Sequence, residues 1–305
     1  MLTKAAIQID LQPSLPHIVH QFPKMVLPGV SIYLYKPDMD VEWVTAVARN
    51  DKVRLGLIVA FLNRHHGLAK IVSWHVIPEC GGRGVGQQLL ASLEDWCRSQ
   101  NIGIMMLELR DASAAYPVAT HIFRKQGWKE QQPLVHRFKV AAKTLQNLEW
   151  GRYRRKPSGL KVIPWQSVSS VQYAELCERW RYDEQFQREF LSFNGENGIE
   201  NSVSLGLCQE DKVVGWVIAH RVRSDLIEYS TLFVEPGCRA TGATVLLLGE
   251  SFLRLAGTQV VNVIFQVKVE NDLMLRFVRK RFHPILSEAT LYRTEKLLDQ
   301  CPIRQ

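Results

Sequence analysis

The sequence has few of the features that mark special protein classes. Gly and Pro number 19 and 13 among 305 residues, too few for a fibrous or low-complexity chain. No uncharged apolar stretch approaches the roughly 20 residues that span a bilayer, and the N-terminal segment lacks the sustained apolar region of a signal peptide. We therefore expect a globular cytoplasmic protein with no membrane partner.

Cysteine and nucleotide-loop motifs are also missing. None of the 6 cysteines forms a CxxC pair, and no Cys/His set has the spacing of zinc ligands. The sequence therefore predicts free thiols and no metal site. A Walker A loop would need Gly-Lys-Ser/Thr, which is absent, so the P-loop class is excluded as well.

What is present is a globular composition with excess positive charge. Hydrophobic residues make up 46%, which excludes intrinsic disorder, and the net charge is +8. The charge favours an anionic partner, such as a nucleic acid, an acidic protein or a phosphorylated cofactor. Nucleic acid is the least favoured of these, because no helix-turn-helix, zinc finger or RNP-like motif is visible.

The chain contains an internal repeat. VIPECGGRGVGQQLL begins at Val76 and VEPGCRATGATVLLL at Val234, an offset of 158 (234 − 76). An Asp-Lys-Val triplet begins at Asp51 and again at Asp211, an offset of 160 (211 − 51). Two colinear matches predict a duplicated domain. We expect an N-terminal domain at 1–150, a basic linker at 151–159 that is either solvated or anion-binding, and a C-terminal domain at 160–305.

Hydrophobic periodicity predicts the same order of elements in each half. The first half is expected to have strands at 42–49, 55–62, 69–76, 104–109 and 135–140, with helices at 85–99 and 118–125. The second is expected to have a helical region at 165–193, strands at 202–207, 213–220, 227–234, 260–267 and 290–294, and helices at 243–256 and 273–280. This order indicates an α/β (α+β) fold.

In each half a glycine-containing turn joins a strand to a helix. The turns are GGRGVG at 81–86 and RATGAT at 239–244. Free N–H groups and the helix dipole bind anions at a helix start, and glycine lets the backbone approach a phosphate closely. Arg83 or Arg239 would add a charge-assisted contact. An ordinary strand-to-helix turn is the alternative interpretation.

Both halves resemble the GNAT superfamily of acyl-CoA-dependent N-acyltransferases, in which V-x-P is followed by Q/R-x-x-G-x-G/A at a helix start. Val76-x-Pro78 fits, with Gly81 in place of the leading Gln or Arg. Val234-x-Pro236 fits, with Thr244 in place of the last small residue. The resemblance implies two tandem domains, each with a central mixed, mostly antiparallel twisted sheet flanked by helices.

The resemblance also implies a cofactor, an acceptor and a set of loop residues. The cofactor would be acetyl-CoA or another acyl-CoA, and the acceptor a small-molecule amine or a protein amine. The assembly would be a monomeric pseudo-dimer or a homodimer. The implied cofactor-binding residues are Val76, Gly81, Gly82, Arg83, Gly84, Val85 and Gly86 in the first half, and Val234, Arg239, Gly242, Ala243 and Thr244 in the second.

The catalytic groups match the family less well. The tyrosine that serves as an acid in many members is replaced by Phe123 and Phe277, which cannot donate a proton. Three residues are candidates for the base. Glu228 stands eight residues before Pro236 (236 − 8), as in the histone-acetylating branch, and could equally face solvent. His75 and Glu108 are the others, with sheet packing and a surface position as their alternatives.

The sequence thus predicts an acyl-CoA-dependent N-acyltransferase, with acetyl as the favoured acyl group. The first half has the better phosphate loop and is expected to hold the cofactor. The other half would then be degenerate. The alternative is a non-catalytic CoA-binding or scaffold protein built from two such domains, which the two missing tyrosines favour.

Overall fold

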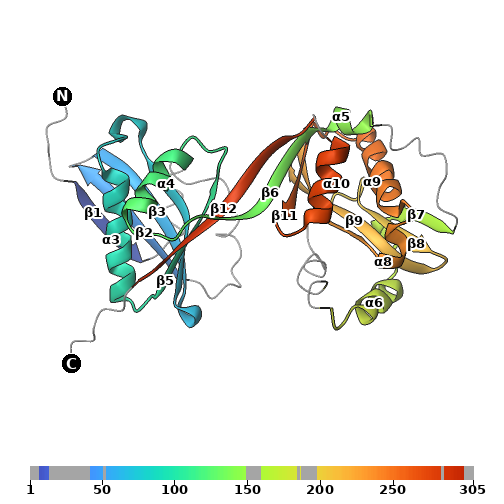
Figure 1. Ribbon diagram of the computed structural model, residues 1–305, viewed down its shortest axis with the longest axis horizontal. Coiled ribbons are helices and arrows are strands. Elements are labelled where there is room, and N and C mark those ends of the chain that lie inside the picture. Colours follow the sequence, from blue (N-terminus) through green and yellow to red (C-terminus); the bar gives the residue numbers. More distant parts are fainter. Residues whose placement is uncertain are drawn as a thin grey trace. The chain divides into compact units, whose positions relative to one another are not determined.

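The computed structural model describes residues 7–13, 42–50, 53–148, 159–183, 186, 198–282 and 285–298 (Figure 1). The chain forms two compact units. The first unit comprises Met1–Leu134 and Thr290–Gln305, and the second unit comprises Val135–Ala289. The linker predicted at 151–159 lies outside the described residues, apart from Gly159.

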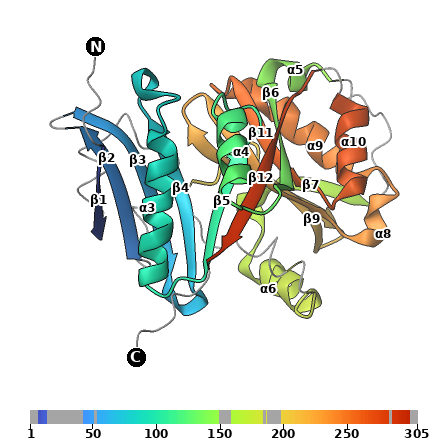
Figure 2. The same cartoon turned by 60° about the vertical axis from the view of Figure 1, so that its left-hand side comes forward.

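The first unit is built on a twisted sheet with one parallel pair of strands. Its order is β1-β2-β3-β4-β5-β12, with bounds Gln8–Pro13, Glu42–Asn50, Val53–Asn63, Leu68–Val76, Ile104–Arg110 and Ser287–Leu297. Strands β4 and β5 are parallel and the other neighbours antiparallel. Helices α3 (Val85–Ser99) and α4 (Tyr116–Lys125) pack on one face and share its apolar core (Figure 2).

The second unit repeats this plan. Its order is β6-β11-β10-β9-β8-β7, with bounds Gln132–Ala141, Asn262–Lys268, Leu226–Val234, Lys212–Arg223, Leu205–Gln209 and Leu160–Pro164. Helices α5 (Ala142–Gln146), α9 (Ala243–Arg254) and α10 (Asp272–Phe282) pack on one face. Helix α6 (Ser170–Arg179) covers the other. The fold class expected from the resemblance is confirmed.

In each unit the two parallel strands pair along only part of their length and then diverge, and they do so at equivalent positions of the repeat. Strands β4 and β5 pair only from Leu68↔Ile104 to Ile71↔Leu107. Strands β10 and β11 pair from Leu226↔Asn262 to Tyr229↔Phe265. Directly after each paired stretch, one residue of the longer strand bulges out of register, Val72 in β4 and Ser230 in β10, again 158 apart (230 − 72). The duplication predicted from the sequence is therefore confirmed in three dimensions.

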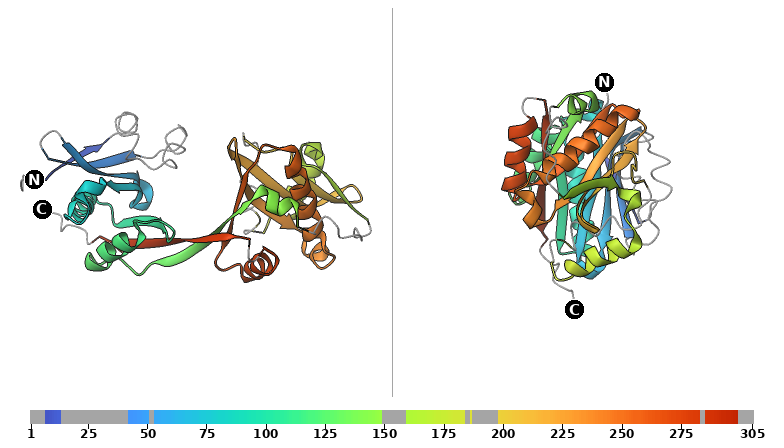
Figure 3. Two further views of the ribbon diagram at one scale, coloured as in Figure 1. Left: turned by 90° about the horizontal axis from the view of Figure 1, so that it is seen from above. Right: turned by 90° about the vertical axis from the view of Figure 1, so that its right-hand side faces the viewer.

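The last strand of each repeat is exchanged between the units. Strand β6 belongs to the first sequence half but pairs with β11 of the second unit. Strand β12 belongs to the second half but pairs with β5 of the first unit, from Leu291↔Arg110 to Leu297↔Ile104 (Figure 3). The divisions at 150 and 160 stay a prediction about the sequence repeat, whereas the compact units divide after Leu134 and after Ala289.

Some elements differ from their predicted bounds. The helical region expected at 165–193 contains a 3-10 turn at Trp165–Ser167 and α6 at Ser170–Arg179, whose capping box at Ser169 and Gln172 fixes its start. Most of 184–197 lies outside the described residues. Strands β1 and β7 were not expected, because short edge strands carry little periodicity.

The expectations about thiols, metals and membranes can be checked on the described residues. All the cysteines among them, from Cys80 to Cys238, are free. No group of three or more His, Cys, Asp or Glu residues in this part of the chain could hold a metal ion. None of the helices that the structure describes is long and apolar enough to cross a membrane.

Candidate functional site

The loop of the first unit forms an open helix start. Strand β4 ends at Val76, and a 3-10 turn at Pro78–Cys80 precedes the glycines. Gly82 and Gly84 have φ of 73° and 80°, values that favour glycine. Gly84 caps α3 without a side-chain hydrogen bond, and the first helical bond runs from Gln88 N–H to its carbonyl at 3.0 Å. The amides of the first turn are thus left for an external acceptor.

The loop of the second unit has the same glycine cap but a different preceding backbone and a different arginine. A short helix, α8 (Pro236–Arg239), precedes Gly242, which caps α9 with a φ of 86°. The Nε of Arg239 donates to the carbonyl of Val234 at 2.7 Å, and its guanidinium lies 6.0 Å from the ring of Phe233. Arg239 therefore braces its own strand, so its charge is already engaged.

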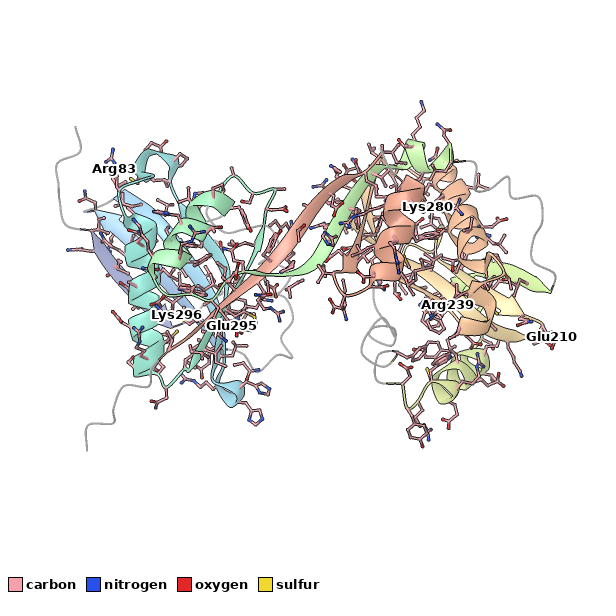
Figure 4. All side chains as sticks on the ribbon, in the orientation of Figure 1. Arg83, Glu210, Arg239, Lys280, Glu295 and Lys296 are labelled. Carbon is pink, nitrogen blue, oxygen red and sulfur yellow. The ribbon has the colours of Figure 1, made fainter. Side chains whose placement is uncertain are left out.

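Arg83 is arranged differently from Arg239 (Figure 4). Its side chain is exposed beside the open helix start, and it has no hydrogen bond or ion pair within the described part of the chain. The sequence predicted the same role for both arginines. The whole guanidinium of Arg83 is therefore available for an incoming anion, whereas Nε of the exposed Arg239 is already bonded to a carbonyl.

Gly86 lies close to a neighbouring tryptophan. A Cβ at Gly86 would lie 3.3 Å from Cζ2 of Trp74, a tight contact that would require the indole to shift slightly. The counterparts of these two residues, 158 positions further on, are Leu232 (232 − 74) and Thr244 (244 − 86). The second half thus has a smaller residue than tryptophan on the strand and a larger residue than glycine in the loop.

Two polar atoms beside this first turn of α3 are buried without a partner. The Nε1 of Trp74 is one of them. Gln126 donates from Nε2 to the carbonyl of Gln87 at 3.3 Å, and its Oε1 is the other. The glycine amides of the loop and the exposed Arg83 side chain fit an anionic ligand.

The positions of the missing tyrosines are apolar packing sites. Phe123 is 2% exposed, and its ring centroid lies 5.7 Å from that of Trp74 and 5.0 Å from that of Trp128. Phe277 packs against the core of the second unit, 6.5 Å from Phe282. Neither position offers a proton to a leaving group.

Tyr116 and Tyr292 pack together rather than replacing those tyrosines. Their rings are 5.5 Å apart, and Tyr292 comes from the exchanged strand β12. Burial, followed by the neighbouring Tyr292 and Asp111, raises the pKa of Tyr116. The phenol of Tyr116 is therefore protonated at neutral pH.

Glu108 is the centre of an ion-pair cluster. It lies 3.0 Å from Nζ of Lys70 on β4 and 2.9 Å from Nη2 of Arg293 on β12. Burial acts to raise the pKa of Glu108, but hydrogen bonds and charges from Arg293 and Lys70 outweigh it, so the pKa is lowered. A general base works best with a pKa near the working pH. The geometry therefore disfavours Glu108 as the base.

We expect Glu108→Gln to lower the free energy of unfolding by about 1–2 kcal/mol at pH 7. A carboxylate whose pKa is lowered by folding stabilises above its unfolded pKa, and this contribution is lost as pH falls through the folded pKa. The difference in the free energy of unfolding between variant and parent should therefore disappear at acidic pH. Urea unfolding between pH 7 and pH 3 checks it, with Glu228→Gln as the matched variant. A gap that stays constant with pH would contradict the assignment.

Glu228 has a less charged environment. Its Oε1 accepts a hydrogen bond from Nε2 of Gln266 at 2.7 Å, and its side chain is half-buried. Glu228 and Gln266 occupy the positions of Lys70 and Glu108 in the repeat, since 228 − 70 and 266 − 108 both equal 158. The Glu228 carboxylate thus binds a neutral amide, whereas Glu108 binds two cations.

His75 lies in the first unit, on the face of the sheet away from α3. Strand alternation places it opposite Trp74 and Val76, which pack against the α3 core, and it pairs with Leu57 of β3. Its side chain is partly exposed. The structure brings His75 and Glu108 into one unit on strands β4 and β5, but it places Glu228 in the other unit.

In the second unit, aromatic side chains occupy the sheet face on which the first unit carries His75. Phe233 is its counterpart (233 − 75 = 158) and is 5% exposed. The ring of Phe233 stacks on Trp216 at 4.6 Å, and Trp180 and Phe186 lie at 5.3 Å and 5.4 Å. This aromatic cluster beneath α6 fills the corresponding position of the second unit, which has a phenyl ring where the first unit has an imidazole.

The sequence missed four residues around the first site. Lys70 and Arg293 fix Glu108, and Trp74 and Gln126 border the helix start. A comparison of the two repeats could have found Trp74, because Trp and Gly in one half are replaced together by Leu and Thr in the other. Arg293 could not have been found, because it reaches the site only through strand exchange.

Comparison with known proteins agrees with this architecture. Residues 17–128 match the model of the acetyltransferase (GNAT) family. A tandem GNAT protein from the clavulanic acid biosynthesis pathway, solved without AcCoA, is 13% identical, with a TM-score of 0.67 over 97% of this chain and 100% of its own. A GCN5-related N-acetyltransferase from Sphaerobacter thermophilus is 16% identical, with a TM-score of 0.58 over 97% and 98%.

A third structure is part of a much larger protein. It is a GCN5-related glucosamine N-acetyltransferase region of a fungal multi-domain GH3 β-N-acetylglucosaminidase, 16% identical, with a TM-score of 0.61 over 96% of this chain and 38% of that one. No curated protein sequence matched. At these identities the structural likeness establishes the fold. Residues 17–128 are therefore similar to the GNAT family, and the fold of the chain is that of the tandem GNAT proteins.

Proposed function

We propose that the protein is an acyl-CoA-dependent N-acyltransferase, with acetyl as the favoured group, and that the first unit binds the cofactor. The observation that carries the proposal is the contrast between the two loops. Arg83 stands free beside an open helix start, whereas Arg239 is bonded to the carbonyl of Val234 at 2.7 Å. The family model also matches only residues of the first half.

The residues that would hold the cofactor divide by the chemistry they offer. Backbone amides at Gly82, Gly84, Val85 and Gly86 suit a pyrophosphate, and Arg83 adds a charge-assisted contact. Gly81 would shape the turn, because its own N–H donates to the carbonyl of Pro78 at 3.0 Å. Val76 would border the pantetheine arm at the end of β4. The second-unit set, Val234, Arg239, Gly242, Ala243 and Thr244, forms the weaker loop in this proposal.

A bound acyl-CoA supplies a thioester that an amine can attack directly. The amine must first lose a proton, and His75 is our proposed base, either directly or through a water molecule, because a neutral imidazole has a ring nitrogen that can accept a proton. The His75 side chain is itself partly exposed, which would let an amine from a small molecule or from a protein approach its ring. Glu228 is a less suitable base in this proposal. It lies in the second unit, where aromatic rings fill the sheet face that corresponds to the one carrying His75.

The loop glycines provide a matched test. Gly84→Asp and Gly242→Asp each place a carboxylate at a helix start, at φ of 80° and 86°, so both variants carry the same backbone strain, which Asp bears better than most residues. We expect Gly84→Asp to weaken acetyl-CoA binding at least tenfold, since about 1.4 kcal/mol, the size of one strong hydrogen bond, is a factor of ten. Gly242→Asp should change the affinity less than twofold.

Isothermal titration calorimetry on the two folded variants checks this result. Equal losses in both would assign the cofactor to both units, and an unchanged affinity in Gly84→Asp would refute the first unit as the binding site. The alternative function, a non-catalytic CoA-binding or scaffold protein, is favoured by Phe123 and Phe277. It predicts binding without release of free CoA across a panel of amines.

A further inference from the structure

Arg137 on β6 of the second unit is a partly buried cation without a partner. Its side chain makes no hydrogen bond or ion pair in the part of the chain that the structure describes. It lies directly opposite Gln266 of β11 in the antiparallel register. Taking a guanidinium group partly out of water costs free energy, which a bound carboxylate would offset. The position of Arg137 therefore suits a ligand with an anionic group.

The first unit shows the same arginine position with a carboxylate opposite it. Glu108 of β5 pairs in register with Arg293 of β12, as Gln266 pairs with Arg137, and 266 − 108 equals 158. Arg293 binds the Glu108 carboxylate at 2.9 Å. In the second unit a neutral amide stands where the first has the carboxylate. Both units thus carry the arginine, but only in the first does the neighbouring strand neutralise it.

A carboxylate lies on the other side of Gln266. Oε1 of Glu228, on β10, accepts from Nε2 of Gln266 at 2.7 Å, and its Oε2 has no partner among the residues that the structure describes. Strands β10, β11 and β6 are consecutive in the sheet, so β10 and β6 run about 10 Å apart. Gln266 therefore separates a carboxylate from a guanidinium group.

These three side chains share one accessible face of the sheet. Residues next to them in sequence belong to the core beneath α9 and α10, namely Ile227, Tyr229, Phe265, Val267 and Phe138. Strand alternation places Glu228, Gln266 and Arg137 on the opposite face. Gln266 is exposed and the other two are partly exposed. The apolar cluster beneath α6 contains no described residue of β11 or β6, so it does not cover this part of the face.

A molecule with both an amine and a carboxylate is the complement of this arrangement. We propose that the second unit binds a zwitterionic ligand of the amino-acid class, with its carboxylate on Arg137 and its ammonium group on Oε2 of Glu228. A guanidinium group can hold a carboxylate through two parallel N–H donors, and an ammonium group donates to a carboxylate oxygen. This site goes beyond the proposed function, because it lies in the second unit and requires neither glycine loop to bind CoA.

Titration of the full chain without CoA, followed by ligand-observed NMR, tests the ligand class. The probes are the common L-α-amino acids, β-alanine and 4-aminobutyrate, with inorganic phosphate as the control anion. The tightest ligand should lose at least about tenfold in affinity as its amide, which lacks the carboxylate, and as its N-acetyl derivative, which lacks the ammonium group. Binding by none of the amino acids, or equally tight binding of phosphate, would overturn the proposal.

Gln266→Glu is the decisive variant, because it recreates the Glu108–Arg293 pair of the first unit. The new carboxylate should engage Arg137 and weaken ligand binding at least about tenfold, with an unchanged circular dichroism spectrum. Arg137→Gln should weaken binding as much, and it keeps the test decisive should the first variant not fold. The matched control is Lys139→Gln, which removes an exposed cation two residues along the same strand. Its affinity should stay within about twofold of the parent.

The variants also separate a specific site from a general effect of positive charge. Equal losses in Arg137→Gln and Lys139→Gln would assign the binding to diffuse charge and refute the site. Parent-like affinity in Gln266→Glu would refute it as well, since a neutralised Arg137 would then make no difference to the ligand. None of these results depends on whether the first unit binds CoA, so the proposed function is tested separately by Gly84→Asp.

Discussion

Ending the chain after Ala289 should unfold the first unit and leave the second intact. This truncation removes β12 from Thr290 onward and with it the register from Leu291↔Arg110 to Leu297↔Ile104. Strand β5 would become an unpaired edge, exposing core residues such as Met105 and Leu107. The loss should exceed about 5 kcal/mol, the whole stability of many domains.

Urea unfolding followed by circular dichroism checks this expectation. The truncated chain should show only the transition of the second unit, while a chain ending after Leu298 should unfold like the parent. A synthetic peptide covering Ser287–Leu298 should restore the lost transition, because an added strand supplies the missing backbone hydrogen bonds. An unchanged first transition in the truncated chain would mean that β12 does not complete the first unit.

Removing the carboxylate of Glu94 should be the most damaging single substitution in the first unit. Its side chain is 5% exposed and accepts from Nζ of Lys296 at 2.6 Å. It also accepts from Nε1 of Trp128 at 2.9 Å. Glu94→Ala would leave a buried ammonium group without its partner, which costs about 3–5 kcal/mol.

A second substitution should reverse much of that loss. In Glu94→Leu with Lys296→Met, no buried charge is left unpaired, so the double variant should be more stable than Glu94→Ala by at least about 1 kcal/mol. Arg98→Ala is the control, because Arg98 is 29% exposed at 3.6 Å from Glu94. It should cost less than about 1 kcal/mol. Chemical denaturation of the three variants measures the differences, and equal losses in all three would refute the buried pair.

The two predictions concern one feature, because Lys296 reaches Glu94 only on the exchanged strand. The helix that opens at the phosphate loop is thus tied at Glu94 to a residue 202 positions away in the sequence. Arg293 ties the same strand to Glu108. The candidate site of the first unit therefore depends on residues encoded in the second sequence half.

Sequence patterns were sufficient to predict those features of the molecule that depend on residues near one another in the chain. The repeat, the order of strands and helices, and both glycine loops follow from periodicity, from turn residues and from the short V-x-P and glycine motifs. The replacement of the acid tyrosine by Phe123 was also visible, and its 2% exposure agrees with a packing role. These features depend on residues close together in the chain.

Only the tertiary structure decided the features that depend on distant partners. It placed β12 on β5, bonded Arg239 to its own strand, surrounded Glu108 with two cations and buried Phe233 where the first unit has His75. Two repeats with similar last strands can pair either way, because the sheet edge is completed by backbone hydrogen bonds that any extended strand offers. A charge or a ring acquires its role from the neighbours that folding brings to it, and the sequence alone does not name them.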